Sequence, residues 1–305
     1  MELIKPGTNL NFVGRMKMAS FASVVVIIIS IVSLLFHGGP NLGIDFAGGT
    51  QVQIKFEKKT EVKDIRDSLA TIDLGKSIIQ QFGYEDNSEF LIKTEKSSSE
   101  IKGLSSSIEE ALTAQFGKDA FEVRRVEVVG PKVGKDLRQK GMLAMVYAII
   151  GILIYITWRF EFRYAIGAII ALVHDVLITV GIFSLLDKEF SLPIIAALLT
   201  IIGYSLNDTI VVFDRIRENL RKVRRQELAG VVNSSINQVL SRTILTSGTT
   251  LLVVGALFFL GGAVIHDFAF ALLVGVVVGT YSSIFIASPT ILAWETVWPS
   301  KKKRK

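Results

Sequence analysis

The sequence predicts an α-helical membrane protein of six transmembrane helices, with one folded α+β domain between the first two helices. Half of the 305 residues are hydrophobic, and they gather in runs long enough to cross a bilayer core of about 30 Å. A block of mixed charge and ordinary globular composition separates the first run from the second. Lysine and arginine are concentrated in alternate loops, as expected for a multi-pass membrane protein.

The apolar runs place the spans at 21–36, 142–158, 164–186, 192–213, 244–260 and 268–294. The first run resembles a signal peptide because it follows positive charge, but no small-residue cleavage site follows it, so we expect a retained anchor. The predicted organisation is therefore an amino-terminal segment (1–20), helix 1 (21–36), a domain with its linkers (37–140), helices 2–6 (141–294) with a basic loop at 214–227, and a basic tail (295–305).

The basic residues predict which side of the membrane each loop occupies. They cluster in the amino-terminal segment, in the turn 159–163, in the loop 215–225 and in the tail 301–305. With six spans these segments share one face, which the positive-inside rule makes cytoplasmic. We therefore expect both termini in the cytoplasm and the block 37–140 in the periplasm. Trp158, Trp294 and Trp298 fall at the cytoplasmic ends, where an aromatic belt is expected.

The block between the first two spans predicts a βαββαβ domain, the ferredoxin-like arrangement. Alternating apolar residues indicate strands at 50–56, 77–84, 89–94 and 121–129, the last with one slip in its alternation. Helical spacing of apolar residues indicates helices at 61–72 and 99–116. No paired catalytic carboxylates, phosphate loop or nucleophile with a base is evident, so we interpret the domain as a binding or moving module and the chain as no enzyme.

Composition argues against several other classes of protein. The chain has no cysteine, which excludes disulfides and thiolate metal sites. Its three histidines (His37, His174 and His266) are scattered, so no metal site is predicted. The net charge of +6 lies beside the spans, and we therefore expect contact with membrane lipid and not with nucleic acid.

Ionisable residues inside the spans are the main candidates for function, because a charge in the membrane is costly unless it is paired or hydrated. The third span holds His174 and Asp175, the fourth holds Asp208, and the fifth opens with Arg242. Asp267 lies at the outer end of the last span. A carboxylate that takes up a proton would release an arginine partner and let the arginine's helix move. We therefore interpret these five residues as a proton path. Such a path requires protons as the coupling ion and no other cofactor.

Structural alternatives apply to the same residues. Asp208 and Arg242 enter the membrane from the same side and could form a buried structural pair, or Arg242 could snorkel to the surface. Polar residues in spans can also simply hold helices together, and Asp267 could cap a helix. Gly275 and Gly279 could pack closely against a helix of this chain or of a partner.

Five segments of the sequence form recognisable motifs: Gly43–Thr50 (GIDFAGGT), Val129–Gly134 (VGPKVG), Ala171–Val176 (ALVHDV), Ile202–Asn219 (IGYSLNDTIVVFDRIREN) and Ser241–Thr250 (SRTILTSGTT). These motifs resemble those of the SecD/SecF family of protein-export membrane proteins, and the match runs from about residue 12 to 292. The fourth motif is long and specific, and it favours the SecF branch over SecD.

The resemblance implies a subunit of the resistance–nodulation–division superfamily in the bacterial inner membrane. Such a subunit works with SecD beside the SecYEG channel and uses the proton motive force to assist a translocating preprotein. In that family Asp208 corresponds to the proton-carrying carboxylate and Arg242 to its partner, while Asp175 and His174 match a motif of less defined role. The six-span length implies that SecD is a separate chain.

The glycine motifs at the two ends of the domain match segments that set how the domain swings. They comprise Gly43, Asp45, Gly48, Gly49, Gly130 and Pro131. The alternative for Asp45 is that it is an acidic cap in a glycine-rich turn. Two other functions compete with the export subunit: a proton-coupled exporter of small molecules or lipids from the same superfamily, and a passive assembly subunit.

Overall fold

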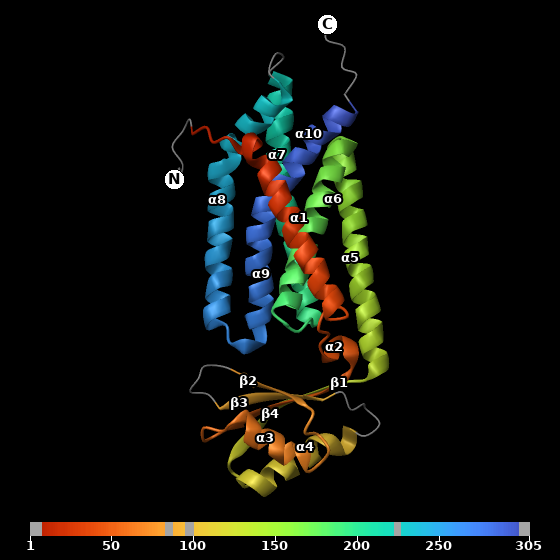
Figure 1. Cartoon of the computed structure of the whole chain (residues 1–305), viewed down its shortest axis with the longest axis vertical. Coiled ribbons are helices and arrows are strands. Elements are labelled where there is room, and N and C mark those ends of the chain that lie inside the picture. Colours follow the sequence, from red (N-terminus) through yellow and green to blue (C-terminus); the bar gives the residue numbers. More distant parts are fainter. Residues whose placement is uncertain (1–7, 83–87, 95–100, 223–226, 299–305) are drawn as a thin grey trace.

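In the computed structural model, a long helix bundle carries a small α/β domain at one end (Figure 1). The structure describes residues 8–82, 88–94, 101–222 and 227–298. Its elements are α1 (Phe12–Phe36), α2 (Ile44–Ala47), β1 (Gly49–Phe56), α3 (Val62–Ala70), β2 (Ile78–Phe82), β3 (Glu89–Thr94), α4 (Ile101–Phe116), β4 (Phe121–Val129), α5 (Pro131–Arg159), α6 (Phe162–Leu185), α7 (Leu192–Lys222), α8 (Leu228–Leu260), α9 (Ala263–Ser282), the π-helical turn η2 (Ser283–Ala287) and α10 (Ser288–Val297).

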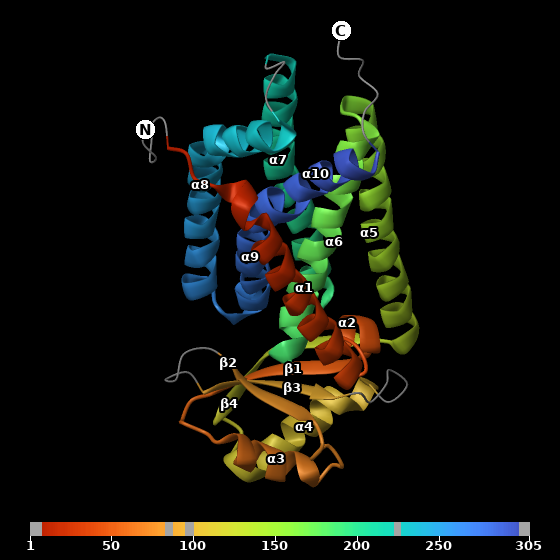
Figure 2. The ribbon, with the colours of Figure 1, turned by 45° about the horizontal axis from the view of Figure 1, so that its top comes forward.

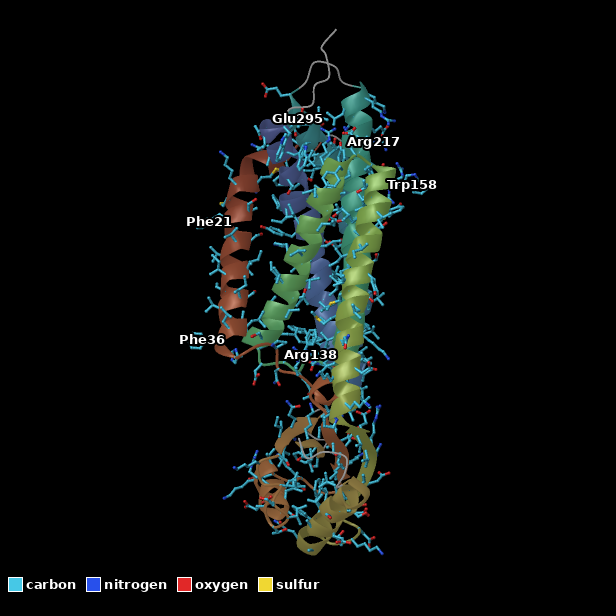
Figure 3. The ribbon with its side chains drawn as sticks, turned by 90° about the vertical axis from the view of Figure 1, so that its right-hand side faces the viewer. Phe21, Phe36, Arg138, Trp158, Arg217 and Glu295 are labelled. Atoms are coloured by element: carbon cyan, nitrogen blue, oxygen red, sulfur yellow. The ribbon has the colours of Figure 1, made fainter. Side chains whose placement is uncertain are left out.

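Six helical segments in the described part of the chain are long and apolar enough to cross a membrane, which confirms the predicted number of spans. The last segment joins α9, η2 and α10. Helices α6, α7 and α9 form the centre of the bundle, whereas α1, α5 and α8 are mostly exposed and lie around them. Trp158, Arg217 and Glu295 lie at the end of the bundle far from the domain, and Phe36 and Arg138 lie near the domain (Figure 3).

Several helices extend beyond the predicted spans. Helix α5 begins at Pro131 and not near residue 141, α7 continues to Lys222 through most of the predicted loop 214–227, and α8 begins at Leu228 and not at 244. Hydropathy marks only the part of a helix inside the bilayer, and it does not register the polar turns that continue outside. At the start of α5, Gly130 is the N-cap and Pro131 occupies the first turn, where proline fits because its missing N–H is not needed.

The last span is not one regular helix. Within it, η2 separates α9 from α10, and Ser288 Oγ donates to the carbonyl of Ser283 at 3.0 Å. Proline near the start of α10 lacks an N–H for the regular ladder, which is one of the usual causes of a local change in helix register. Helix α10 consequently runs at an angle to α9 (Figure 2).

The α/β domain has the predicted order of strands and helices, and its sheet has the strand order β2-β3-β1-β4 with antiparallel pairs. Helices α3 and α4 cover one face of the sheet, and the other face is turned toward the bundle (Figure 1). The core includes Ile54, Ile92, Leu69 and Leu112, all fully buried. The slip that the sequence shows in β4 is a bulge, where the register with β1 shifts between Gln53 and Ile54.

Parts of the predicted organisation fall outside the described residues. These are the start of the amino-terminal segment, the turn at 83–87, the beginning of the predicted helix 99–116, the loop residues 223–226 and the tail from 299.

Candidate functional site in the helix bundle

Asp208 lies in the core of the bundle with one carboxylate oxygen bonded and the other free. The residue is 6% exposed, and its Oδ1 accepts a hydrogen bond from Thr243 Oγ1 of α8 at 2.9 Å. Among the described residues, buried Oδ2 has no hydrogen-bond partner. An oxygen left without a partner in a buried site is unusual, and Oδ2 retains the capacity to accept a further hydrogen bond.

Arg242 does not reach Asp208 directly. No ion pair joins the two within the described chain, and the Arg242 side chain is exposed on the outer face of α8. Thr243, the next residue, contacts Asp208 instead. Helices α7 and α8 therefore meet at this level, but the hydroxyl of Thr243 contacts Asp208 and the guanidinium of Arg242 does not.

Asp175 is the most completely bonded carboxylate in the bundle. It is 1% exposed. Its Oδ1 pairs with His174 Nδ1 at 2.8 Å, and its Oδ2 accepts from Ser205 Oγ of α7 at 2.5 Å and from Ser282 Oγ of α9 at 2.8 Å. The His174 ring is stacked on Tyr281, with ring centroids 6.1 Å apart. Asp175 thus connects α6 to both other central helices.

Hydroxyl groups continue this polar contact between the helices. Tyr204 Oη donates to Ser247 Oγ at 3.2 Å, which is hydrogen-bonded to Thr280 Oγ1 at 2.7 Å. Thr209 Oγ1 and Ser283 Oγ, in η2, are 2.8 Å apart. A polar seam therefore runs among α6, α7, α8 and α9 at the level of Asp175 and Asp208.

The glycine pair of α9 packs against α7 of the same chain. A Cβ atom on Gly279 would lie 2.9 Å from the Cβ of Ser205, and one on Gly275 would overlap Ile201. This close approach brings the α9 serines within reach of α7. It resolves the two alternatives for these glycines in favour of packing within the chain.

Asp267 lies apart from the seam, at the end of the bundle nearest the domain. Its Oδ1 accepts from Lys188 Nζ, in the loop between α6 and α7, at 2.6 Å. The N-cap of α9 is Gly262, so the capping alternative for Asp267 is wrong.

Asp45 caps a helix other than its own. Its Oδ2 accepts from the backbone N–H of Leu192 at 2.8 Å, and Leu192 is the first residue of α7. Two backbone hydrogen bonds fix the same segment: Gly43 N–H donates to the carbonyl of Phe190 at 2.9 Å, and Phe190 N–H donates to that of Asn41 at 2.6 Å. The first glycine motif is thereby attached to the end of the helix that carries Asp208.

Two glycines and the second motif form the junction between this segment and the sheet. Gly48 and Gly49 have φ values of 80° and 138°, which favour glycine. A Cβ on Gly48 would lie 2.9 Å from the Cα of Pro131. The first motif, through Gly48 and Gly49, therefore lies against the second, through Gly130 and Pro131.

A second connection between the domain and the bundle was not predicted from the sequence. Lys93 of β3 forms an ion pair with Glu189 of the loop between α6 and α7, and their side chains are only 11% and 19% exposed. Burial lowers the pKa of Lys93, while the nearby carboxylates of Asp267 and Asp45 act in the opposite direction. The pair lines a hollow of about 610 Å³ between the sheet and the end of the bundle.

The sequence around each residue does not indicate the roles of Ser282 or of the Lys93–Glu189 pair. A serine in an apolar helix and a lysine on a mixed-charge sheet are common, and their partners lie far away in the chain. The proline near the start of α10 was a usable signal for the irregular helix beside the seam.

Together, the fold and the site define a multi-pass membrane protein whose bundle encloses bonded ionisable residues and carries an α/β domain at one end. The family described as "Protein export membrane protein SecD/SecF, C-terminal" matches residues 108–297, and the "SecD/SecF GG Motif" matches residues 33–60. The chain belongs to this SecD/SecF family, and it is a multi-pass protein of the inner membrane.

Relatives named "Protein translocase subunit SecF" match nearly the full chain. The relative from Magnetococcus marinus is 53% identical over 96% of this chain and 94% of its own length, and that from Desulfurispirillum indicum is 50% identical over 93% and 92%. The crystal structure of SecDF from Thermus thermophilus, described as a translocon-associated membrane protein, is similar with a TM-score of 0.85 and 41% identity over 95% of this chain. The chain spans 39% of that solved chain.

Proposed function

We propose that this chain is the SecF-type subunit of an export complex that uses the proton motive force to assist preprotein translocation, with Asp208 as the proton-carrying group. The observation that carries the proposal is the buried Asp208 carboxylate, bonded at one oxygen by Thr243 and free at the other. Protons are the only coupling species required. A proton crossing the membrane supplies about 2.3 kcal/mol per 100 mV.

Helix α7 links the proton site to the α/β domain. The helix places Asp208 in the bundle and begins at the Asp45 cap. A change of charge at Asp208 would alter its contact with α8. A resulting movement of α7 would displace the segment that carries Asp45 and leads into the α/β domain. We place this domain in the periplasm and both termini in the cytoplasm, because the basic loops gather at the opposite end of the bundle.

The exposed position of Arg242 supports a partner subunit. An arginine on the outer face of a membrane helix is costly against lipid, and neighbouring Thr246 and Thr249 are exposed as well. We propose that SecD covers this face and completes the proton site, with the SecYEG channel and the preprotein as further partners. The solved relatives are SecDF chains, and this chain covers 39% and 40% of their length.

Export in cells that carry Asp208→Asn tests the proposal. Asparagine keeps the size of the side chain and can still accept from Thr243, but it cannot carry a proton. We expect the complex to assemble at normal abundance and export to fall at least tenfold. Asp214→Asn is the matched control, because Asp214 lies on the same helix but is half exposed, and this variant should export normally.

Normal export by the Asp208→Asn variant would reject Asp208 as the proton carrier and favour a passive assembly subunit. Normal export combined with loss of proton-coupled efflux of a small molecule or lipid would favour the exporter alternative. That alternative requires a substrate cleft between two outer domains, and the described residues of this chain form one small α/β domain.

A further inference from the structure

We propose that Asp175 is a positioning residue: it fixes the rotation of α7 and α9 about α6, and through α7 it sets the direction of the free oxygen of Asp208. The proposal rests on the proposed function of Asp208. It assigns Asp175 a different task from Asp208, although both are buried carboxylates in the same bundle.

The first argument is the bonding of the Asp175 carboxylate. Ser205 and Ser282 both donate to Oδ2, so this oxygen is a double acceptor wherever the proton of the His174 contact resides. Oδ1 is occupied by His174 Nδ1. Within the described chain Asp175 therefore has no free oxygen for a transported proton, whereas Asp208 has one.

The second argument is the position of Ser205 on α7. Ser205 lies three residues before Asp208, so the two side chains share one face of the helix. Thr209, directly after Asp208, is hydrogen-bonded to Ser283. Contacts to Asp175 and to η2 thus hold α7 on both sides of Asp208, and a rotation of α7 would break both.

The third argument is the close packing of α7 against α9. Gly279 packs on Ser205 so closely that a Cβ would lie 2.9 Å from the serine Cβ. The two serines that bond Asp175 are therefore held by backbone packing as well as by their hydroxyls. Because Asp175 accepts a hydrogen bond from each of these two helices, it fixes their positions relative to each other.

The experiment uses the absence of cysteine in the chain. Asp208→Cys introduces a single thiol whose rate of modification by a small methanethiosulfonate reagent reports how often position 208 becomes accessible. The rate is measured in membranes containing the assembled complex, alone and combined with Asp175→Asn or Ser205→Ala. A merely structural role would lower the amount of complex without changing the rate in the complex that remains.

We expect each second substitution to raise the modification rate about tenfold, the factor by which the loss of one hydrogen bond to a charged group shifts a local equilibrium. Asp175→Asn and Ser205→Ala together should act no more strongly than the larger single effect, because they remove the same contact. Ser282→Thr, which keeps the hydroxyl, should leave the rate near its starting value, and Ser282→Ala should not.

An unchanged rate in complexes that carry Asp175→Asn or Ser205→Ala would overturn the proposal. If Asp175→Asn prevents assembly, the comparison of Ser282→Ala with Ser282→Thr decides the question by itself. The assay does not depend on proton transport, since the thiol replaces the carboxylate. A changed rate together with normal export by Asp208→Asn would therefore reject the proposed function and leave the positioning role intact.

Discussion

Reversing the charge of Lys93 or Glu189 should release the α/β domain from the bundle, and reversing both should restore the contact. The two side chains belong to β3 and to the loop between α6 and α7, so their ion pair bridges the two parts of the molecule. Lys93→Glu would place two carboxylates together, next to Asp45 and Asp267. Glu189→Lys would place two ammonium groups together. The double variant recovers one charge of each sign.

The expected magnitude follows from how far the pair is buried. An exposed ion pair contributes about 0–1 kcal/mol, and removal of one partner from a fully buried pair costs about 3–5 kcal/mol. With side chains 11% and 19% exposed, Lys93 and Glu189 lie between these limits. We expect each single reversal to weaken the seating of the domain by about 2 kcal/mol, roughly a thirty-fold change in its equilibrium.

Distances between two spin labels measure the seating directly. Cysteines replacing exposed Lys118 of the domain and exposed Leu260 of the bundle would carry the labels in a chain that has no other cysteine. The single reversals should broaden or shift the distance distribution, and the double variant should narrow it again. Lys140→Glu is the matched control, because Lys140 pairs with Asp136 in an exposed site.

Two results would refute this reasoning. If the single reversals leave the distance distribution unchanged, the ion pair does not hold the domain. If the double variant is as broad as the single variants, the effect comes from something other than the attraction between the two charges.

Three further predictions concern the cap, the helix packing and the domain core. Asp45→Ala should destabilise the first turn of α7 by about 1 kcal/mol, seen as faster amide hydrogen exchange there, whereas Asp45→Asn should retain most of the protection. Gly279→Ala should lower the midpoint of thermal unfolding in detergent, because overpacking costs about 1–3 kcal/mol. Gly255→Ala, with open space around it, should not. Leu112→Ala should cost about 2–5 kcal/mol in the fully buried core of the domain, and a normal melting profile would contradict that core assignment.

Local patterns in the sequence predicted most of the fold. Long apolar runs identified the six spans, since the bilayer sets a minimum length for them. Alternation identified the strands, and even the slip in β4 corresponds to a bulge opposite Gln53 and Ile54. The helix ends were predicted less well, because the polar turns after Pro131 and Leu228 continue outside the apolar part.

The site was predicted in its members but not in its contacts. Asp208 and Asp175 stand out because a carboxylate in an apolar helix is rare. The sequence offered Arg242 either as a partner of Asp208 or as a residue that snorkels to the surface; in the structure Thr243 contacts Asp208 and Arg242 is exposed. One residue corresponds to about 100° of rotation around a helix, so apolar length alone does not determine which of two neighbouring residues faces inward.

The close approach of Gly48 to Pro131 makes the α/β domain a modular insertion. The chain leaves the bundle and returns to it at neighbouring points, since a Cβ on Gly48 would lie 2.9 Å from the Cα of Pro131 and Gly49 pairs with Val129 in the sheet. Segments whose ends lie together can be exchanged or removed with little strain on the rest of a fold. A short linker in place of residues 49–130 should therefore leave the six-helix architecture intact, and the α/β domain can diverge in sequence and size away from its contact with Glu189.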